Sequence, residues 1–324
     1  MGFGLIFLTP LVCLNQTLVI TPSTMTTIET VEEEVSCPCR SDLPPTISFR
    51  SSTRQYLQCR NCALVFRSPR PRNIAIEEDY KQSYDAIYLE SGVDPYRAPV
   101  FRSVLEHLSS YKTPPGHLLD IGCGAGEFAV LCQNMGWTCS GVELSQQAAA
   151  VAAQQGITML SGECLGETGA PSDEWGPFDA ITLINVLDSM CDPIGVLRRV
   201  RQMLRPGGVV VIRIPNATFH LFIRRMLILL NAQCQQVFHL YIYSPSTLAN
   251  LLRSVGLTTL SVRNSKTGST PGCAPEKGAE HPFRRLIWRA GGIGLWCIAQ
   301  TMYWLTRKEA VWAPSFELVA TRQD

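Results

Sequence analysis

The stretch LLDIGCGAGEF, residues Leu118–Phe128, places three glycines at alternate positions directly after an apolar run. The apolar run predicts a buried strand, and Glu127–Met135 has the composition of a helix. Glycine allows a tight turn without Cβ clashes, so the backbone can approach a ligand closely. Because the first N–H groups of the helix point into the same space, we expect a nucleotide-like ligand at this turn.

The spacing of the glycines and the acid before them indicate which ligand to expect. Dinucleotide folds place a pyrophosphate on a G-x-G-x-x-G turn. Here the spacing is G-x-G-x-G, and Asp120 lies two residues before the first glycine. A carboxylate at that place would repel a pyrophosphate and attract a cation. S-adenosylmethionine (SAM) carries an ammonium and a sulfonium but no phosphate, so SAM is the expected cofactor.

This stretch resembles motif I of the class I SAM-dependent methyltransferases, and the resemblance runs from about residue 80 to the end of the chain. The turn Arg205-Pro206-Gly207-Gly208 resembles the family's turn before strand five. The resemblance implies an α/β fold with a Rossmann-like, seven-stranded, mostly parallel sheet of order 3-2-1-4-5-7-6 and helices on both faces. After Leu118–Ile121 the expected strands are Trp137–Val142, Ile157–Leu160, Phe178–Ile184, Val209–Ile214, Leu257–Val262 and an antiparallel Phe316–Arg322.

An acidic residue ends the second expected strand: Glu143, seventeen residues after Gly126. A carboxylate there can accept hydrogen bonds from both ribose hydroxyls. The resemblance implies that Glu163, where the family usually has Asp, accepts the adenine amino group, and that the Cys164 N–H meets a ring nitrogen. The expected cofactor-binding set is Asp120, Gly122, Cys123, Gly124, Gly126, Glu143, Leu144, Glu163, Cys164 and Asn185.

The reaction implied by the resemblance is an in-line displacement, in which an acceptor atom attacks the SAM methyl group. The sulfonium is already activated, so the protein mainly supplies alignment and desolvation. A hydroxyl or an acidic carbon as acceptor would need a base. The candidates by position are Asp188, His239 and Tyr241. Many relatives have Glu-His where this chain has Asp188-Ser189, so the imidazole they place there is missing.

Two cysteine pairs, Cys37-x-Cys39 and Cys59-x-x-Cys62, enclose a short strand-rich loop and indicate a zinc-ribbon-like segment. Zinc prefers four tetrahedral thiolates, and so small a unit needs a metal to hold its shape. The second pair has the usual spacing, whereas the first is one residue short. Similar segments precede the catalytic domain in a group of bacterial methyltransferases. Both a zinc site and a metal-free relic of one remain open.

The expected organisation is a flexible leader over residues 1–36, the ribbon over 37–72, and the methyltransferase domain over 73–324 with inserted helices in 216–243 and 282–308. The apolar stretch 1–20 has no Lys or Arg, so a start codon assigned too early, with Met25 as the true first residue, is favoured over a membrane anchor. Residues 282–308 contain four arginines and one lysine without an acid. Their uncharged centre is short for a bilayer, so it fits a helix lying on a membrane surface, or a cap or dimer contact.

A hydrophobic content of 46%, a charged content of 17% and a net charge of +1 describe a globular chain with no global attraction for nucleic acid. The thirteen cysteines are scattered, which suits a reducing, cytoplasmic setting. The leading hypothesis is a methyltransferase acting on a sugar, lipid-like or quinone-like small molecule. The alternatives are an RNA methyltransferase with an arginine-rich ribbon, a non-catalytic SAM-fold protein at a membrane surface, and a nicotinamide dehydrogenase.

Overall fold

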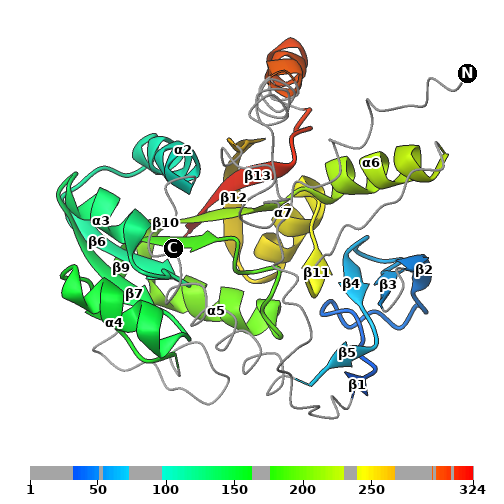
Figure 1. The fold of residues 1–324 in the computed structure, drawn as a ribbon, viewed down its shortest axis with the longest axis horizontal. Coiled ribbons are helices and arrows are strands. Elements are labelled where there is room, and N and C mark those ends of the chain that lie inside the picture. The colour runs from blue at the N-terminus through cyan, green and yellow to red at the C-terminus, as the bar shows by residue number, and fades with distance from the viewer. Residues whose placement is uncertain are drawn as a thin grey trace, which may run out of the picture.

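The computed structural model describes residues 32–50, 54–72, 97–162, 176–229, 239–266, 294, 297–307 and 310–323. Two members of the expected cofactor-binding set, Glu163 and Cys164, lie outside these residues. The remaining candidate residues all fall within them. Figure 1 shows a large sheet flanked by helices, with a small N-terminal sheet beside it.

A seven-stranded sheet forms the centre of the large unit, and its strand order confirms the expected one. Only its last strand in sequence, β13, runs antiparallel to its neighbours. Extended apolar runs that are buried on both faces explain why these segments become strands. From one edge to the other, the strands are β12 (Leu257–Asn264), β13 (Ser315–Arg322), β10 (Leu204–Pro215), β9 (Phe178–Ile184), β6 (Gly116–Ile121), β7 (Trp137–Val142) and β8 (Thr158–Met159).

Helices cover both faces of the sheet (Figure 1). Their starts follow local rules, because the side chains of Ser145, Asp192 and Ser244 each accept a hydrogen bond from a backbone N–H of the first helical turn. The described residues include a helical segment within 297–305 and the helices α2 (Ala98–Ser109), α3 (Glu127–Gln133), α4 (Gln146–Gln154), α5 (Pro193–Met203), α6 (Ala217–Leu229) and α7 (Pro245–Ser254).

Alternate residues of the central strands pack into two different cores. On β6, Leu119 and Ile121 join one core with α5 and α7, while Leu118 joins the other with α2 and α3. Each fully buried leucine or isoleucine contributes about 1.5–3 kcal/mol. The carboxyl ends of β6, β7 and β9 meet at one edge of this sheet, which is where ligands bind in open α/β sheets.

The small N-terminal sheet contains a strand that sequence analysis did not assign to it. Its order is β11-β4-β3-β2, and β11 (Tyr241–Ile242) comes from the methyltransferase unit. The other strands are β2 (Thr46–Arg50), β3 (Gln55–Gln58) and β4 (Val65–Arg67). A further pair, β1 (Glu32–Glu33) with β5 (Arg70–Pro71), means that residues directly before Cys37 also form a strand.

Candidate functional site

The glycine turn connects β6 to α3 and has the backbone geometry that makes glycine necessary. Gly122, Gly124 and Gly126 have φ values of 71°, 56° and 86°, a region that other residues enter at a cost. A Cβ on Gly122 would lie 2.5 Å from a methyl carbon of Val186. The turn therefore brings the backbone close to the end of β9. The N-terminus of α3 faces the space between the turn and the end of β9.

Glu143, at the end of β7, holds this turn in place. Its two carboxylate oxygens accept hydrogen bonds from the N–H groups of Gly124 and Ser145, each at 2.9 Å. Each carboxylate oxygen can accept a second hydrogen bond. The side chain is only partly buried, so it can also accept the hydroxyl protons of a ribose placed against the turn.

Asp120 lies buried beneath the turn, and Thr182 of the neighbouring β9 donates a hydrogen bond of 2.6 Å to its Oδ1. Burial raises the pKa of Asp120 to about 7, against the opposing effects of the Thr182 hydrogen bond and the Arg97 charge. The carboxyl group is therefore close to half-ionised at neutral pH. A cationic ligand nearby would favour its charged form.

This titration predicts that SAM binding to the wild type strengthens between about pH 5.5 and pH 7.5, by up to about tenfold per pH unit below the pKa. Binding a cation lowers the Asp120 pKa and so releases a proton, which makes higher pH favourable. Asp120→Asn should bind SAM more weakly and lose this part of the pH dependence. Calorimetric titration of SAM into both proteins in matched buffers checks this prediction. The asparagine variant is the control, because it retains the pH dependence that comes from the amino group of SAM itself. Two parallel profiles would contradict the assignment.

Arg97 is a residue of this site that sequence analysis missed. It stands directly before α2, and its guanidinium lies 3.3 Å from the Glu127 carboxylate at the start of α3. Its charge also lowers the pKa of Asp120, so it lies within electrostatic reach of the turn. The methionine part of SAM carries a carboxylate as well as an ammonium, and Arg97 is the candidate to pair with it. The sequence offered only an arginine at a helix start as a signal.

Three further predicted residues have different surroundings. Cys123 is buried, and its sulfur fills the space behind the turn against Gly141, so only its backbone faces the ligand side. Leu144 is exposed and lies near Gly162, at the edge where an adenine would follow the ribose. Asn185 has a φ of 58° at the end of β9, and its side-chain oxygen accepts a hydrogen bond from Arg213.

The structure brings the three candidate catalytic residues together at the carboxyl end of β9. The backbone carbonyl of Asp188 accepts hydrogen bonds of 3.0 Å from the N–H groups of Leu240 and Tyr241. The Asp188 carboxyl is buried, and its Oδ1 has no hydrogen-bond partner among the described residues. Burial raises its pKa, and the Coulombic effect of the nearby His239 partly opposes this.

Tyr241 differs from the other two in its chemistry. Burial raises its pKa to about 12, so the phenol keeps its proton near neutral pH. Its hydroxyl lies 3.2 Å from both the Cys191 carbonyl and the Arg70 guanidinium. The hydroxyl can donate to the carbonyl and accept from the arginine, which suits a residue that fixes the wall of a site. Asp188 and His239 remain the candidates for proton transfer.

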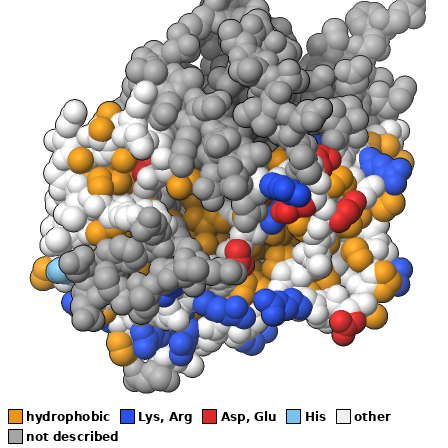
Figure 2. Space-filling model, turned by 90° about the horizontal axis from the view of Figure 1, so that it is seen from below, with side chains coloured by type: hydrophobic (Ala, Val, Ile, Leu, Met, Phe, Trp, Pro, Cys, Tyr) orange, Lys and Arg blue, Asp and Glu red, His pale blue; other side chains and the backbone are white. Residues whose placement is uncertain are grey.

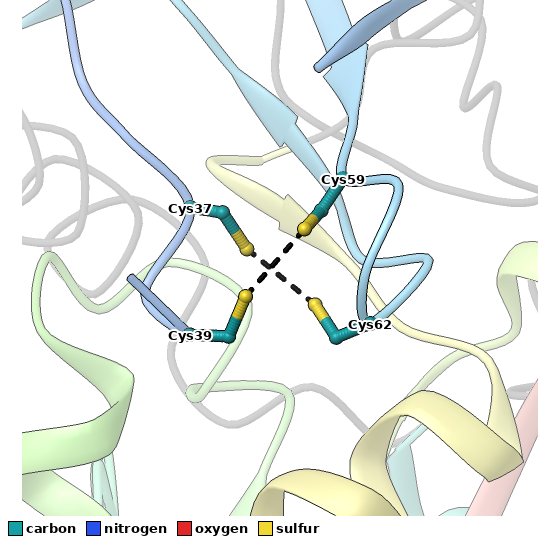
Figure 3. Close-up of side chains that lie close together, drawn as sticks. All are labelled: Cys37, Cys39, Cys59 and Cys62. Atoms are coloured by element: carbon teal, nitrogen blue, oxygen red, sulfur yellow. Dashed lines mark hydrogen bonds between the residues drawn. The ribbon is translucent and has the colours of Figure 1, made fainter. Parts of the chain in front are cut away.

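The four ribbon cysteines form a compact cluster in which the sulfurs point toward one centre (Figure 3). All four sulfurs lie within 4.8 Å of one another, with Cys37–Cys62 and Cys39–Cys59 separations of 3.5 Å. A Zn–S bond of about 2.3 Å in a tetrahedron places the sulfurs about 3.8 Å apart. The hydrogen bond from Cys37 lowers the pKa of Cys62 to about 5, which favours one thiolate. An all-thiolate set suits zinc rather than Mg²⁺ or Ca²⁺.

The sheet order, the strand–glycine turn–helix unit and the antiparallel strand β13 together define the class I SAM-dependent methyltransferase fold. A family model described as "Methyltransferase domain" matches residues 93–262, more than half of the chain. The chain therefore belongs to this methyltransferase family, and SAM is the methyl donor that the fold and family imply.

Curated proteins with similar sequences are also described as methyltransferases. "Ubiquinone biosynthesis O-methyltransferase" of Caulobacter sp. (strain K31) is 34% identical over 109 residues, which cover 31% of this chain and 41% of that protein. The Xanthomonas axonopodis pv. citri protein of the same description is 25% identical over 118 residues, 35% of this chain and 49% of that one. The chain thus spans less than half the length of these curated relatives.

Among solved structures, the magnesium protoporphyrin IX methyltransferase of Synechocystis PCC 6803 with bound S-adenosylhomocysteine (SAH) has a TM-score of 0.50 at 13% identity. The match covers 78% of this chain and all of that one. A putative methyltransferase in complex with the Trm112 activator of Haloferax volcanii has the same TM-score and identity, over 74% and 98% of the two chains. These similarities establish the fold.

Proposed function

We propose that this protein transfers a methyl group from SAM to a hydroxyl of a quinone-like small molecule. The observation that carries the proposal is the buried Asp188 carboxyl, whose Oδ1 lacks a partner among the described residues at the ligand-binding edge of the sheet. The curated relatives described as ubiquinone biosynthesis O-methyltransferases support this acceptor class.

In the proposed reaction the acceptor oxygen attacks the SAM methyl carbon from the side opposite the sulfur. The new O–C bond forms as the S–C bond breaks, and neutral SAH leaves. The hydroxyl proton passes to the Asp188 carboxylate, whose pKa is raised by burial, so it is a stronger base than an exposed aspartate. The glycine turn and Glu143 hold the nucleoside, and Asp120 stabilises the methionine ammonium, directly or through water.

Asp188→Asn should lower kcat by about 10²–10⁴-fold and leave the affinity for SAM nearly unchanged, because it removes the base but keeps the shape of the side chain. The assay measures SAH release with a series of catechol and hydroxyquinol acceptors, each with and without a prenyl chain. Retained turnover in the variant would rule out Asp188 as the base. No turnover by the wild type with any member of the series would rule out the proposed acceptor class.

The contacts of the ribbon give the RNA alternative less support. Arg67 and Arg70 pair with Glu32 and Glu33 at 2.7 and 3.3 Å, so two acidic residues that precede the ribbon neutralise part of its positive charge. Figure 2 shows acidic and basic side chains interspersed on the right of one face, with basic side chains in a row along its lower edge. Affinity for a phosphate backbone grows with the number of phosphates that Lys and Arg neutralise, and each arginine held in an internal ion pair contributes less to it. Filter binding of tRNA at low salt tests this alternative, and salt-sensitive binding would revive it.

A lipid surface is the second partner that we propose, because it suits a quinone-like acceptor. Two described helical segments carry large exposed apolar side chains: Phe222, Met226, Ile228 and Leu229 on α6, and Ile298, Met302, Trp304 and Leu305 within residues 297–305. The residues between 193 and 275 include nine Arg and one Lys but no Asp or Glu. Among the described helices none has the length and apolarity needed to cross a bilayer. Contact would therefore be peripheral.

Leu229→Ser combined with Leu305→Ser should reduce co-sedimentation with anionic phospholipid vesicles by about tenfold or more, since each change removes exposed apolar area from the contact. Leu260→Ser is the matched control, because Leu260 is an exposed leucine on β12, outside both segments. Equal binding by all three proteins, or no binding by the wild type, would contradict membrane contact at these helices.

A further inference from the structure

The ribbon and the acceptor side of the methyltransferase unit share one sheet. Strand β11 pairs antiparallel with β4, with Tyr241 opposite Phe66 and Ile242 opposite Val65. The N–H of Arg67 also donates to the Leu240 carbonyl at 2.8 Å. In Figure 1 the ribbon strands lie beside β11, close to α7. The position of residues 239–243 is therefore set in part by a sheet whose other strands belong to the ribbon.

The same short segment, residues 239–243, is hydrogen-bonded to the backbone of Asp188, the proposed base. The Leu240 carbonyl and the Tyr241 side chain point toward the ribbon. The N–H groups of both residues donate to the Asp188 backbone carbonyl. At its other end, the Tyr243 carbonyl accepts from the N–H of Ala217 at the start of α6. The backbone thus forms a continuous path from the ribbon through 240–243 to Asp188.

Arg70, at the exit from the ribbon, adds a second connection. Its buried guanidinium donates to the Tyr241 hydroxyl at 3.2 Å and to the Cys191 carbonyl at 3.1 Å. It also pairs with Glu33 of β1. One ribbon side chain therefore fixes both β11 and the loop that follows Asp188, which makes Arg70 a positioning residue for the acceptor side.

The cofactor side is anchored differently. The glycine turn is held by backbone hydrogen bonds to Val142 and by Glu143, and Asp120 is bonded to Thr182 of β9. These contacts lie within the central sheet and its turns. The order of the nucleoside pocket should therefore not depend on the ribbon.

The strands of the ribbon are short. Besides a small core that Tyr56 and Val65 form with Ala217 and Ile242, the cysteine cluster is what connects its loops. Strand β2, at the edge of its sheet, is largely exposed, and strands β3 and β4 are only four and three residues long. Cys37 and Cys59 are buried in the same core as Phe66 and Tyr241. A metal at the cluster would join the first loop of the ribbon to the β3–β4 turn, at the base of the strand that pairs with β11.

We propose that a zinc ion bound by Cys37, Cys39, Cys59 and Cys62 orders the ribbon and, through β4, Arg70 and β11, sets the acceptor side of the catalytic centre, while SAM binding is independent of the metal. The inference rests on the proposed function for its reference to an acceptor. The structural part of the inference is that the metal orders residues 239–243 and that the nucleoside pocket does not depend on the metal. Testing this part does not require turnover.

The test begins with metal analysis of the full-length protein, where one zinc ion per chain is expected. Hydrogen exchange is then followed before and after zinc removal with a thiol-reactive mercurial and chelator, later reversed with thiol. Exchange should accelerate by about tenfold or more in peptides covering 55–67 and 239–243, since these amides lose their ordered partners. Peptides covering 116–142 should keep their protection, and SAH affinity should change by less than about threefold.

Two variants separate coupling from general unfolding. Cys62→Ser should reproduce the loss of zinc and of protection at 239–243, whereas Cys297→Ser, an exposed cysteine outside the cluster, should behave as the wild type. Arg70→Met should keep zinc and ribbon protection yet speed exchange at 239–243, and raise the acceptor KM more than it changes kcat.

Three results would overturn the inference: no zinc in the purified protein, unchanged protection at 239–243 after zinc removal, or a parallel loss of SAH affinity. Failure of the acceptor series to be methylated would end the proposed function alone, because the metal, exchange and SAH measurements do not use an acceptor.

Discussion

Replacing Glu317 by alanine is expected to lower the free energy of unfolding by about 3–5 kcal/mol, because buried donors would lose their acceptor. Glu317 lies on β13 with no exposed surface. Its carboxylate accepts hydrogen bonds from Ser103 at 2.6 Å, Ser265 at 2.9 Å and Arg263 at 2.9 Å, and His107 lies 3.2 Å away. One carboxylate thus ties α2 and the end of β12 to the antiparallel strand.

The same contacts give the variant a pH signature. Burial alone would raise the pKa of Glu317, but the nearby His107, the Arg263 charge and the Ser103 hydroxyl lower it from 4.5 to about 2. A lowered folded-state pKa means that the stabilisation is complete above about pH 4.5 and is lost as the pH falls toward about 2. The wild type should therefore lose more stability than Glu317→Ala over that interval.

Urea unfolding at neutral pH and at several lower values measures both effects. Glu106→Ala is the matched control, because the Glu106 side chain is 61% exposed and its carboxylate lies 3.9 Å from Lys266. That change should cost less than about 0.5 kcal/mol. Equal stability of the two variants would show that the Glu317 network does not stabilise the fold.

Gly122→Ala is expected to weaken SAH binding by about 30-fold or more, because the new Cβ cannot be accommodated without moving the turn. The residue has a φ of 71°, and the Cβ would lie 2.5 Å from a Val186 methyl carbon. The left-handed conformation alone costs about 1–2 kcal/mol. The steric conflict then displaces the N–H groups that face the ligand, and a displaced pocket loses affinity.

Gly156→Ala provides the control for backbone strain. Gly156 has a φ of 82°, and a Cβ there would meet nothing within 4 Å. It follows the C-terminal end of α4 and is not itself part of the glycine turn. This variant should lose about 1 kcal/mol of stability and keep wild-type affinity for SAH. Calorimetric titration compares the two, and equal affinities would show that the Gly122 turn does not contact the cofactor.

The central strands were predictable because their signals are local, and their order followed from the resemblance to the methyltransferase family. The run Phe178–Ile184 is almost entirely apolar, and the structure has a strand with these bounds. The glycine turn was equally predictable, since glycines at alternate positions allow the positive φ angles that the structure shows. Ser145 and Asp192 fixed the starts of two helices by ordinary capping.

The contacts between distant segments were not predictable from the sequence. The pairing of β11 with β4 joins residues far apart in the chain, and two residues carry too little pattern to reveal a strand. Arg97 and Glu317 are ordinary charged residues in sequence, and only the fold brings Arg97 to the turn and buries Glu317. The positions of Asp188 and His239 followed from the resemblance, whereas their shared surroundings required the structure.

Titration of SAM into the purified protein is the most direct test of the claim that this glycine turn, with Asp120 beneath it and Glu143 beside it, binds a nucleoside carrying positive charge. The expected result is saturable binding of one molecule per chain with a Kd of about 1–100 µM, together with a marked loss of affinity in Glu143→Ala. Absence of measurable heat with both SAM and SAH at about 1 mM, or equally strong binding of NAD, would contradict the claim.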